Sequence, residues 1–150
     1  MRIKKPELAE SINHPKIPLR DHRSSEVLFL NPLRKSVTKI KVDGVEITEG
    51  KRCDWCLIYD GLGVYFIELK AGPSGTAFEQ LEATLVAYNA DRCTTFQFSC
   101  VVVSTGPGSI SDRTSRAKWA EKLRRQYRAK VYNIGPSRSF DLNSKPQRLD

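Results

Sequence analysis

The chain has 150 residues, of which 39% are hydrophobic, so it is long enough for one domain whose single core needs no disulfide or metal. The net charge of +8 is concentrated at the ends: residues 1–23 carry 6 Lys/Arg against 3 Asp/Glu, and residues 111–150 carry 11 against 4. No segment approaches the roughly 20 apolar residues of a membrane span, and the first residues lack a signal-peptide pattern. We therefore expect a cytoplasmic protein without a membrane partner.

Composition divides the chain into three parts. Residues 1–23 contain three prolines and no sustained hydrophobic period, which predicts a basic lead-in arm. Residues 24–135 are predicted to form the single folded domain. Residues 136–150 hold Pro, Ser, Asn, Lys and Arg with little apolar content, so we expect a basic, weakly ordered tail.

The first half of the domain is predicted to consist of strands. A short apolar run over residues 25–30 is followed by alternation over residues 37–42, and the turn pair Asp43-Gly44 predicts a hairpin to residues 45–47. Two further apolar runs, residues 52–59 and 64–70, are joined by a tight glycine-containing connection. This pattern predicts a pair of antiparallel neighbours.

The second half alternates helices and strands. Apolar residues at helical spacing predict an amphipathic helix over residues 76–89, and the nearly continuous apolar run at 96–103 indicates a central strand buried on both faces. A second helix is expected from Ser111-Asp112 to Lys130, with a short strand over residues 131–134. We therefore expect an α/β fold with a mixed sheet.

Three charged residues lie in the two central strands. Because side chains alternate along a strand, Glu68 and Lys70 share one face of an otherwise apolar segment, and Asp54 lies in the preceding strand, nearly opposite Glu68. Burying such charges costs several kcal/mol unless they are paired or bind an ion. Two adjacent carboxylates repel each other, and a divalent cation with a preference for oxygen ligands, such as Mg²⁺, removes that repulsion.

Asp54 followed after thirteen residues by Glu68-Leu69-Lys70, then by a turn and a helix bearing Gln80, resembles the PD-(D/E)xK nuclease superfamily. The resemblance covers about residues 24–103 and implies the restriction-endonuclease-like αβββαβ core, a mixed central sheet flanked by helices, with the basic second helix as an addition. It also implies that Asp54, Glu68 and the Leu69 carbonyl hold Mg²⁺, with Mn²⁺ as a substitute. Lys70 would then position or deprotonate the attacking water.

The match departs from the family pattern in two places. Cys53 stands where many members have proline, and Thr84 stands four residues after Gln80 where many carry tyrosine, with Tyr88 one turn further on. We expect Gln80 to face the metal still. The resemblance also makes Glu26 a candidate for the additional acidic residue that many members carry in their first element.

Basic side chains on the second helix are candidates for contacts with nucleic-acid phosphates. These residues are Lys118, Lys122, Arg124, Arg125 and Arg128. Such a cluster neutralises phosphates without reading bases, although a merely solvated helix face fits the pattern equally well.

Three functions remain open on the sequence. The first is a Mg²⁺-dependent nuclease acting on nucleic acid, with DNA favoured over RNA, in which a homodimer or a partner protein supplies specificity. The second is a catalytically silent nucleic-acid-binding or protein-interaction subunit with the same fold. The third is a small zinc protein held by its four cysteines, but the spacing of the second pair, Cys93 and Cys100, argues against it, and core hydrophobes are the better interpretation.

Overall fold

A computed structural model describes residues 1–21, 26–71, 76–104, 110–135 and 139–143, and of Lys70, Ala71 and residues 110–112 it describes the backbone alone. The elements run in chain order as η1 (Pro6–Leu8), β1 (Glu10–Ile12), β2 (Lys16–Leu19), β3 (Val27–Leu30), β4 (Val37–Lys41), β5 (Trp55–Tyr59), β6 (Gly63–Ala71), α1 (Thr76–Ala87), η2 (Ala90–Arg92), β7 (Gln97–Ser104), α2 (Ile110–Tyr127), β8 (Lys130–Ile134) and β9 (Phe140–Asp141).

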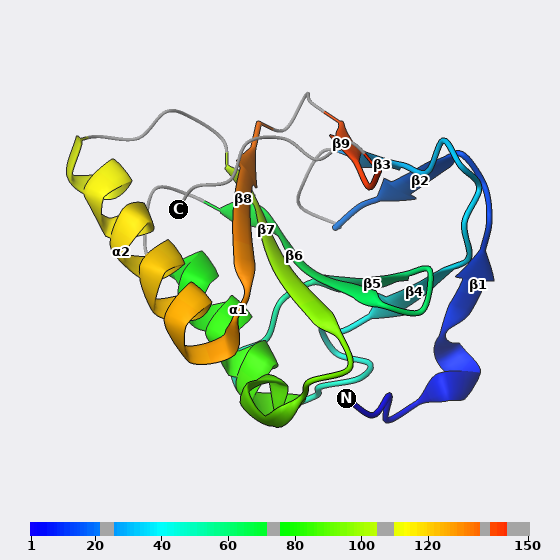
Figure 1. Ribbon diagram of the computed structural model, residues 1–150, viewed down its shortest axis with the longest axis horizontal. Helices are drawn as coiled ribbons and strands as arrows, with labels where there is room; N and C mark the ends of the chain where they lie inside the picture. The colour runs from blue at the N-terminus through cyan, green and yellow to red at the C-terminus, as the bar shows by residue number, and fades with distance from the viewer. Residues whose placement is uncertain (22–25, 72–75, 105–109, 136–138, 144–150) are drawn as a thin grey trace.

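A six-stranded mixed sheet in the order β1-β4-β5-β6-β7-β8 forms the centre of the molecule (Figure 1). The strands from β1 to β6 pair antiparallel, whereas β6, β7 and β8 pair in parallel. The two parallel steps are made by α1 and α2. Because such crossovers share one handedness, both helices lie on the same face of the sheet. The predicted α/β class with a mixed sheet is confirmed.

The two helices run side by side in the same direction. Phe78 of α1 stacks on Trp119 of α2 at a centroid distance of 5.9 Å, and one turn further along Glu82 pairs with Lys122 at 3.0 Å. Both helices begin where β6 and β7 end, so the amino termini of α1 and α2 lie at the edge formed by the carboxyl ends of β6, β7 and β8. We call this edge the carboxyl edge.

The face of the central sheet opposite the helices is covered by a second, three-stranded sheet in the order β2-β3-β9. The ring of Phe140 in β9 lies 5.4 Å from Phe29, 5.8 Å from Tyr65 and 5.2 Å from Tyr132, measured between centroids. The helices of the described residues thus flank the mixed central sheet on one face, and strands cover the other. The initial helix of an αβββαβ core is also not among the described elements, since strands and the single-turn η1 precede β4.

Both ends of the chain are more ordered than their composition suggested. In the segment expected to be a lead-in arm, β1 pairs with β4 and β2 pairs with β3, and the side chains of Ile17 and Leu19 are fully buried. In the segment expected to be a tail, β9 pairs in parallel with β3, and Leu142 is buried. In β2 buried apolar residues alternate with exposed ones, and burial of the apolar face stabilises the strand although the segment contains prolines.

The hairpin predicted at Asp43-Gly44 does not form. β4 pairs with β1 and β5, and the chain after it makes only one isolated bridge, between Asp43 and Ile47. The reason is a tertiary contact: Glu46 is 4% exposed and accepts hydrogen bonds from the backbone N–H groups of Lys4 and Lys5 and from the Tyr88 hydroxyl. This carboxylate holds the segment as a folded loop.

The cysteines behave as the sequence predicted. All four are free thiols, and Cys53, Cys56 and Cys100 are fully buried in the core between the central sheet and the helices. Cys93 is half-buried. Burial raises the pKa of the Cys100 thiol to about 12, as expected for a group that packs as a small hydrophobe. Neither described helix is long and apolar enough to span a membrane.

Candidate functional site

The antiparallel pair β5–β6 forms as predicted and carries two buried carboxylates. Asp54, directly before β5, is 7% exposed, and Glu68 in β6 is 5% exposed. Glu68 projects from the helix-side face, because Phe66 two residues earlier belongs to that core. It also lies near Cys53: burial is the main cause of the raised pKa of the Cys53 thiol, and the Glu68 carboxylate adds to it.

The strand is irregular at Asp54. Trp55 is paired with Ile67, yet the N–H of Asp54 also points to the Ile67 carbonyl, at 3.1 Å, instead of continuing the ladder to Glu68. Cys53 and Cys56 are three positions apart, an odd number that would place them on opposite faces of a regular strand, yet both enter the helix-side core, so one extra residue is accommodated there. Asp54 and Glu68 thus lie on neighbouring segments of the chain but do not face one another across a regular ladder, contrary to the prediction that they lie nearly opposite each other.

The side chain of Asp54 is fixed by the backbone of β6. Its Oδ2 accepts a hydrogen bond of 2.8 Å from the N–H of Leu69. Burial raises the pKa of Asp54, and the Asp21 carboxylate adds to this, whereas the Leu69 N–H and the Lys41 ammonium lower the pKa. A buried carboxylate whose charge is only partly compensated by the protein favours a bound cation.

A second irregularity occurs in β6 directly after Glu68. Glu68 pairs with Val102 and Ala71 pairs with Ser104, so three steps on β6 are matched by two steps on β7. One residue in this part of β6 is therefore left out of regular pairing, which leaves backbone groups available for other partners. Bulges of this kind are frequent next to active sites.

Helix α1 supports the site through Thr84, a residue whose role was not foreseen. The Thr84 side chain is fully buried, and its Oγ1 accepts a 2.9 Å hydrogen bond from the N–H of Cys53 while donating to the Gln80 carbonyl. Gln80 lies one turn nearer the carboxyl edge on the same stripe of the helix and is half-buried. Tyr88 stacks on Phe66 and donates a hydrogen bond to Glu46.

The remaining predicted residues are placed as follows. Lys70 lies in β6 two residues after Glu68, and its side chain is outside the described part. Glu26 is exposed and pairs with Arg20 at 3.0 Å. The acidic residues whose charges raise the pKa of Asp54 are Asp21 and, to a smaller extent, Asp43. Sequence reasoning passed over Asp21 because it lies in the segment taken for a lead-in arm.

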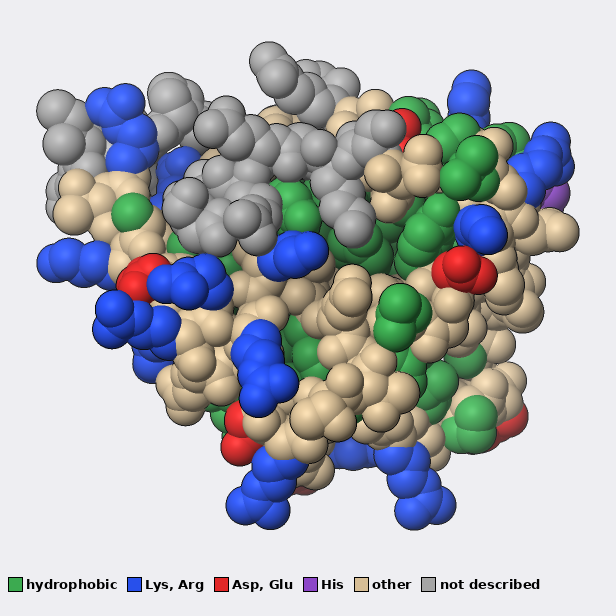
Figure 2. Space-filling model, in the orientation of Figure 1, with side chains coloured by type: hydrophobic (Ala, Val, Ile, Leu, Met, Phe, Trp, Pro, Cys, Tyr) green, Lys and Arg blue, Asp and Glu red, His purple; other side chains and the backbone are tan. Residues whose placement is uncertain are grey.

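The basic residues predicted to contact phosphates lie along α2, where Lys and Arg side chains gather at the left of Figure 2. Three of them have carboxylate partners: Lys122 pairs with Glu82, and Arg124 and Arg125 pair with Glu121. These three, together with Arg128, belong to the end of the helix that is remote from the carboxyl edge. Lys118, in the middle of α2, is exposed.

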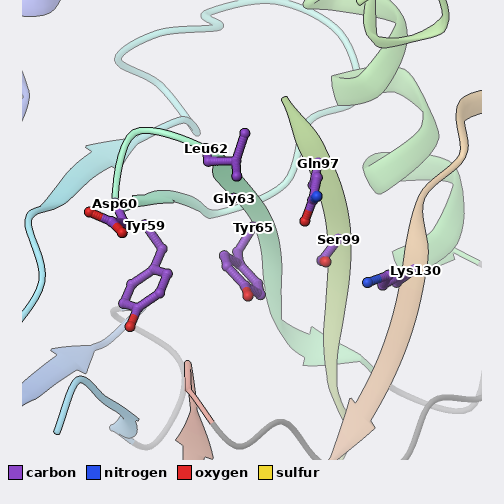
Figure 3. A pocket seen from close by; sticks show the side chains of 8 residues that line it. All are labelled: Tyr59, Asp60, Leu62, Gly63, Tyr65, Gln97, Ser99 and Lys130. Atoms are coloured by element: carbon purple, nitrogen blue, oxygen red, sulfur yellow. The ribbon is translucent and has the colours of Figure 1, made fainter. Parts of the chain in front are cut away.

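A cavity of about 220 Å³ lies at the opposite edge of the sheet (Figure 3). It is lined by the first residues of β6, β7 and β8, which are Gly63, Gln97 and Lys130, and by side chains that include Tyr59 and Tyr65. Glu68 lies five positions after Gly63 along the extended strand, a distance of about 17 Å. This cavity is therefore not part of the Asp54–Glu68 site.

Comparison with known proteins gives no relative: no family model, no curated protein and no solved structure matches the chain.

Proposed function

We propose that the chain is a magnesium-dependent nuclease of the PD-(D/E)xK type that hydrolyses phosphodiester bonds in DNA. The observation that carries the proposal is the pair of buried carboxylates, Asp54 and Glu68, on adjoining strands, each next to an irregularity of its own strand. Buried charges at such positions are costly to the fold, and a functional site is the usual reason for keeping them.

The order of elements around the pair supports the proposal. The segment from β4 to β7 has the sequence β4-β5-β6-α1-β7, which is the βββαβ part of the expected core, and the Glu-x-Lys triplet ends the third of these strands. The three-stranded β2-β3-β9 sheet stands on the face where a helix was expected. Asp21, two residues after the end of β2, would replace Glu26 as the additional acidic residue near the metal.

The donor set fits a hard divalent cation. Asp54, Glu68 and a backbone carbonyl of the irregular segment at Leu69 would hold Mg²⁺ through oxygen atoms, with places left for water and phosphate. Among the described residues no three His, Cys, Asp or Glu side chains group as ligands, but this set needs only two carboxylates. When bound, the ion supplies a Lewis acid for the phosphoryl oxygen and lowers the pKa of its water.

The chain's own residues would complete the chemistry. The backbone N–H of Leu69 orients Asp54, and Thr84 holds the chain directly before it. Lys70 would stabilise charge on the phosphate and align the attacking water, and Gln80 would help to orient the same water.

The test is cleavage of single- and double-stranded, linear and circular DNA and RNA by the pure protein with Mg²⁺, Mn²⁺ or a chelator. We expect metal-dependent cleavage of DNA that Glu68→Gln and Lys70→Ala each reduce by at least about a hundredfold, with the fold retained. Asp60→Asn, an exposed carboxylate at the turn of the same hairpin, is the matched control. Binding of nucleic acid without cleavage in either metal would instead identify a silent binding subunit and refute the enzyme.

A further inference from the structure

One arginine in the described part of the chain is buried without a counter-charge. Arg116 of α2 is 9% exposed, and its Nη2 is buried with no hydrogen-bond partner. The ion pairs of the described residues include none to Arg116, whereas Lys122, Arg124 and Arg125 on the same helix all have carboxylate partners. Burying a guanidinium in this state is unfavourable, so a ligand is the natural reason for it.

Helix α2 places Arg116 near the carboxyl edge. The buried side chains of α2 are Arg116, Ala120, Leu123 and Tyr127, which form one stripe that faces the sheet. Tyr127 is three residues before the start of β8, and Arg116 lies about 16 Å back along the helix. Since β8 runs antiparallel to α2 and spans about 13 Å from Lys130 to Ile134, Arg116 comes level with the end of β8.

Two polar side chains lie near the end of β8 on the face of the sheet that α2 covers. Ser104 at the end of β7 is 5% exposed and donates a 2.7 Å hydrogen bond to the Oδ1 of Asn133 in β8, which leaves the Asn133 amide NH₂ as a donor. Ser104 is paired with Ala71 of β6, three residues after Glu68. Ser104 and Asn133 therefore lie one and two strand spacings of about 5 Å from β6, which carries Glu68, and Arg116 lies above them on α2.

The electrostatics of this edge favour an anion. The amino termini of α1 and α2 both lie here, and each adds a partial positive charge to that of Arg116. A planar guanidinium matches two phosphate oxygens at once, which a lysine does not. Because Arg116 is only 9% exposed, a small tetrahedral anion can reach it more readily than an extended acidic surface can.

We propose that Arg116, with Ser104 and Asn133, forms a subsite that binds a substrate phosphate next to the one that is cleaved. This inference rests on the proposed nuclease function and names a residue that selects and positions its substrate. The phosphate belongs either to the end of a strand or to the continuous backbone, and both sources present the same oxygens to Arg116.

The first experiment measures thermal unfolding with inorganic phosphate in the presence of a chelator. The wild type is expected to melt at a higher temperature as phosphate is added, relative to chloride at equal ionic strength. Arg116→Met should melt higher than the wild type without phosphate, since it removes an uncompensated buried charge, and should gain nothing from phosphate. Arg116→Lys should keep part of the gain, and Arg92→Met, an exposed arginine of η2, should behave as the wild type does. No gain in the wild type, or an equal gain in Arg116→Met, overturns the subsite.

The second experiment uses oligonucleotides with and without a 5′-phosphate, together with circular DNA. Arg116→Met should raise KM by about tenfold or more with a smaller change in kcat. If Arg116→Met raises KM only for oligonucleotides with a 5′-phosphate, the subsite binds a terminal phosphate. If it raises KM equally for circular DNA, the subsite binds a phosphate of the continuous backbone. Unchanged KM on every substrate overturns the subsite and leaves the nuclease intact. Phosphate stabilisation that depends on Arg116, without cleavage in any metal, supports the subsite and refutes the nuclease.

Discussion

The hydrogen bond between the Cys53 N–H and the Thr84 hydroxyl offers a direct test of how the candidate site is held. Thr84→Val keeps the volume of the side chain but removes the acceptor, and both groups are buried, so the Cys53 N–H is left without a partner. Leaving a buried donor unsatisfied costs about 1–3 kcal/mol. In a chain of this length each kcal/mol lowers the melting temperature by about 2–4 °C, so we expect a fall of about 2–12 °C.

The functional effect of Thr84→Val should exceed its effect on stability. The bond fixes the chain at the irregularity directly before Asp54, and a displacement of about 1 Å at a reacting group costs up to about a hundredfold in rate. We therefore expect weaker Mg²⁺ binding by calorimetry and a kcat reduced by about tenfold or more.

Thr84→Ser is the matched control, because it keeps the hydroxyl and loses one buried methyl group, a change worth about 1 kcal/mol. It should retain Mg²⁺ affinity and kcat. The reasoning is refuted if the valine and serine variants bind Mg²⁺ equally well and have equal kcat, since the acceptor then contributes nothing to the position of Asp54.

Four further outcomes follow from the structure. Because burial raises the pKa of Asp54, the stability that this group contributes is present at low pH and is lost as pH rises through its folded-state pKa. In urea titrations Asp54→Asn should thus be at least as stable as the wild type at pH 7 and should lose this advantage toward pH 4. The same variant should fail to bind Mg²⁺. Tyr88→Phe leaves the buried Glu46 with one hydrogen bond fewer and should cost about 1.5–3 kcal/mol of unfolding free energy with kcat/KM unchanged. In thiol titration of the native protein only Cys93 should react quickly, and three more thiols should react after unfolding. Lys118→Ala should lower the slope of log K for DNA against log salt by about one, and an unchanged slope would remove Lys118 from the interface.

The central part of the fold was accessible from the sequence because local signals and tertiary structure agree there. The connection at Asp60-Gly61 between two apolar runs predicted the β5–β6 pair, but the irregularity at Asp54, which ends the regular register at Trp55–Ile67, was not predicted. The two crossover helices were likewise predicted from apolar spacing, within two or three residues at their ends. Such segments need no information from elsewhere in the chain.

The sequence failed where distant contacts decide the structure. The loop at residues 43–47 carries a strong hairpin signal, but the capture of Glu46 by the chain's first residues overrides that signal. Nothing near Cys53 in the sequence points to Thr84, since the bond joins residues 31 positions apart. Arg116 could have been found, because it extends the spacing of Ala120, Leu123 and Tyr127 by one turn, but a charged residue was counted as part of the polar face.

The parallel pairing of β9 with β3 has a consequence for the order in which the protein can fold during synthesis. The ring of Phe140 contacts those of Phe29 in β3, Tyr65 in β6 and Tyr132 in β8, all of which precede it in the sequence and are therefore made earlier. Until Phe140 has left the ribosome, Tyr65 and Tyr132 of the central sheet lack this contact. The nascent protein therefore passes through a stage in which part of this hydrophobic sheet face is exposed, and a chaperone that binds aromatic surfaces would bind it at that stage.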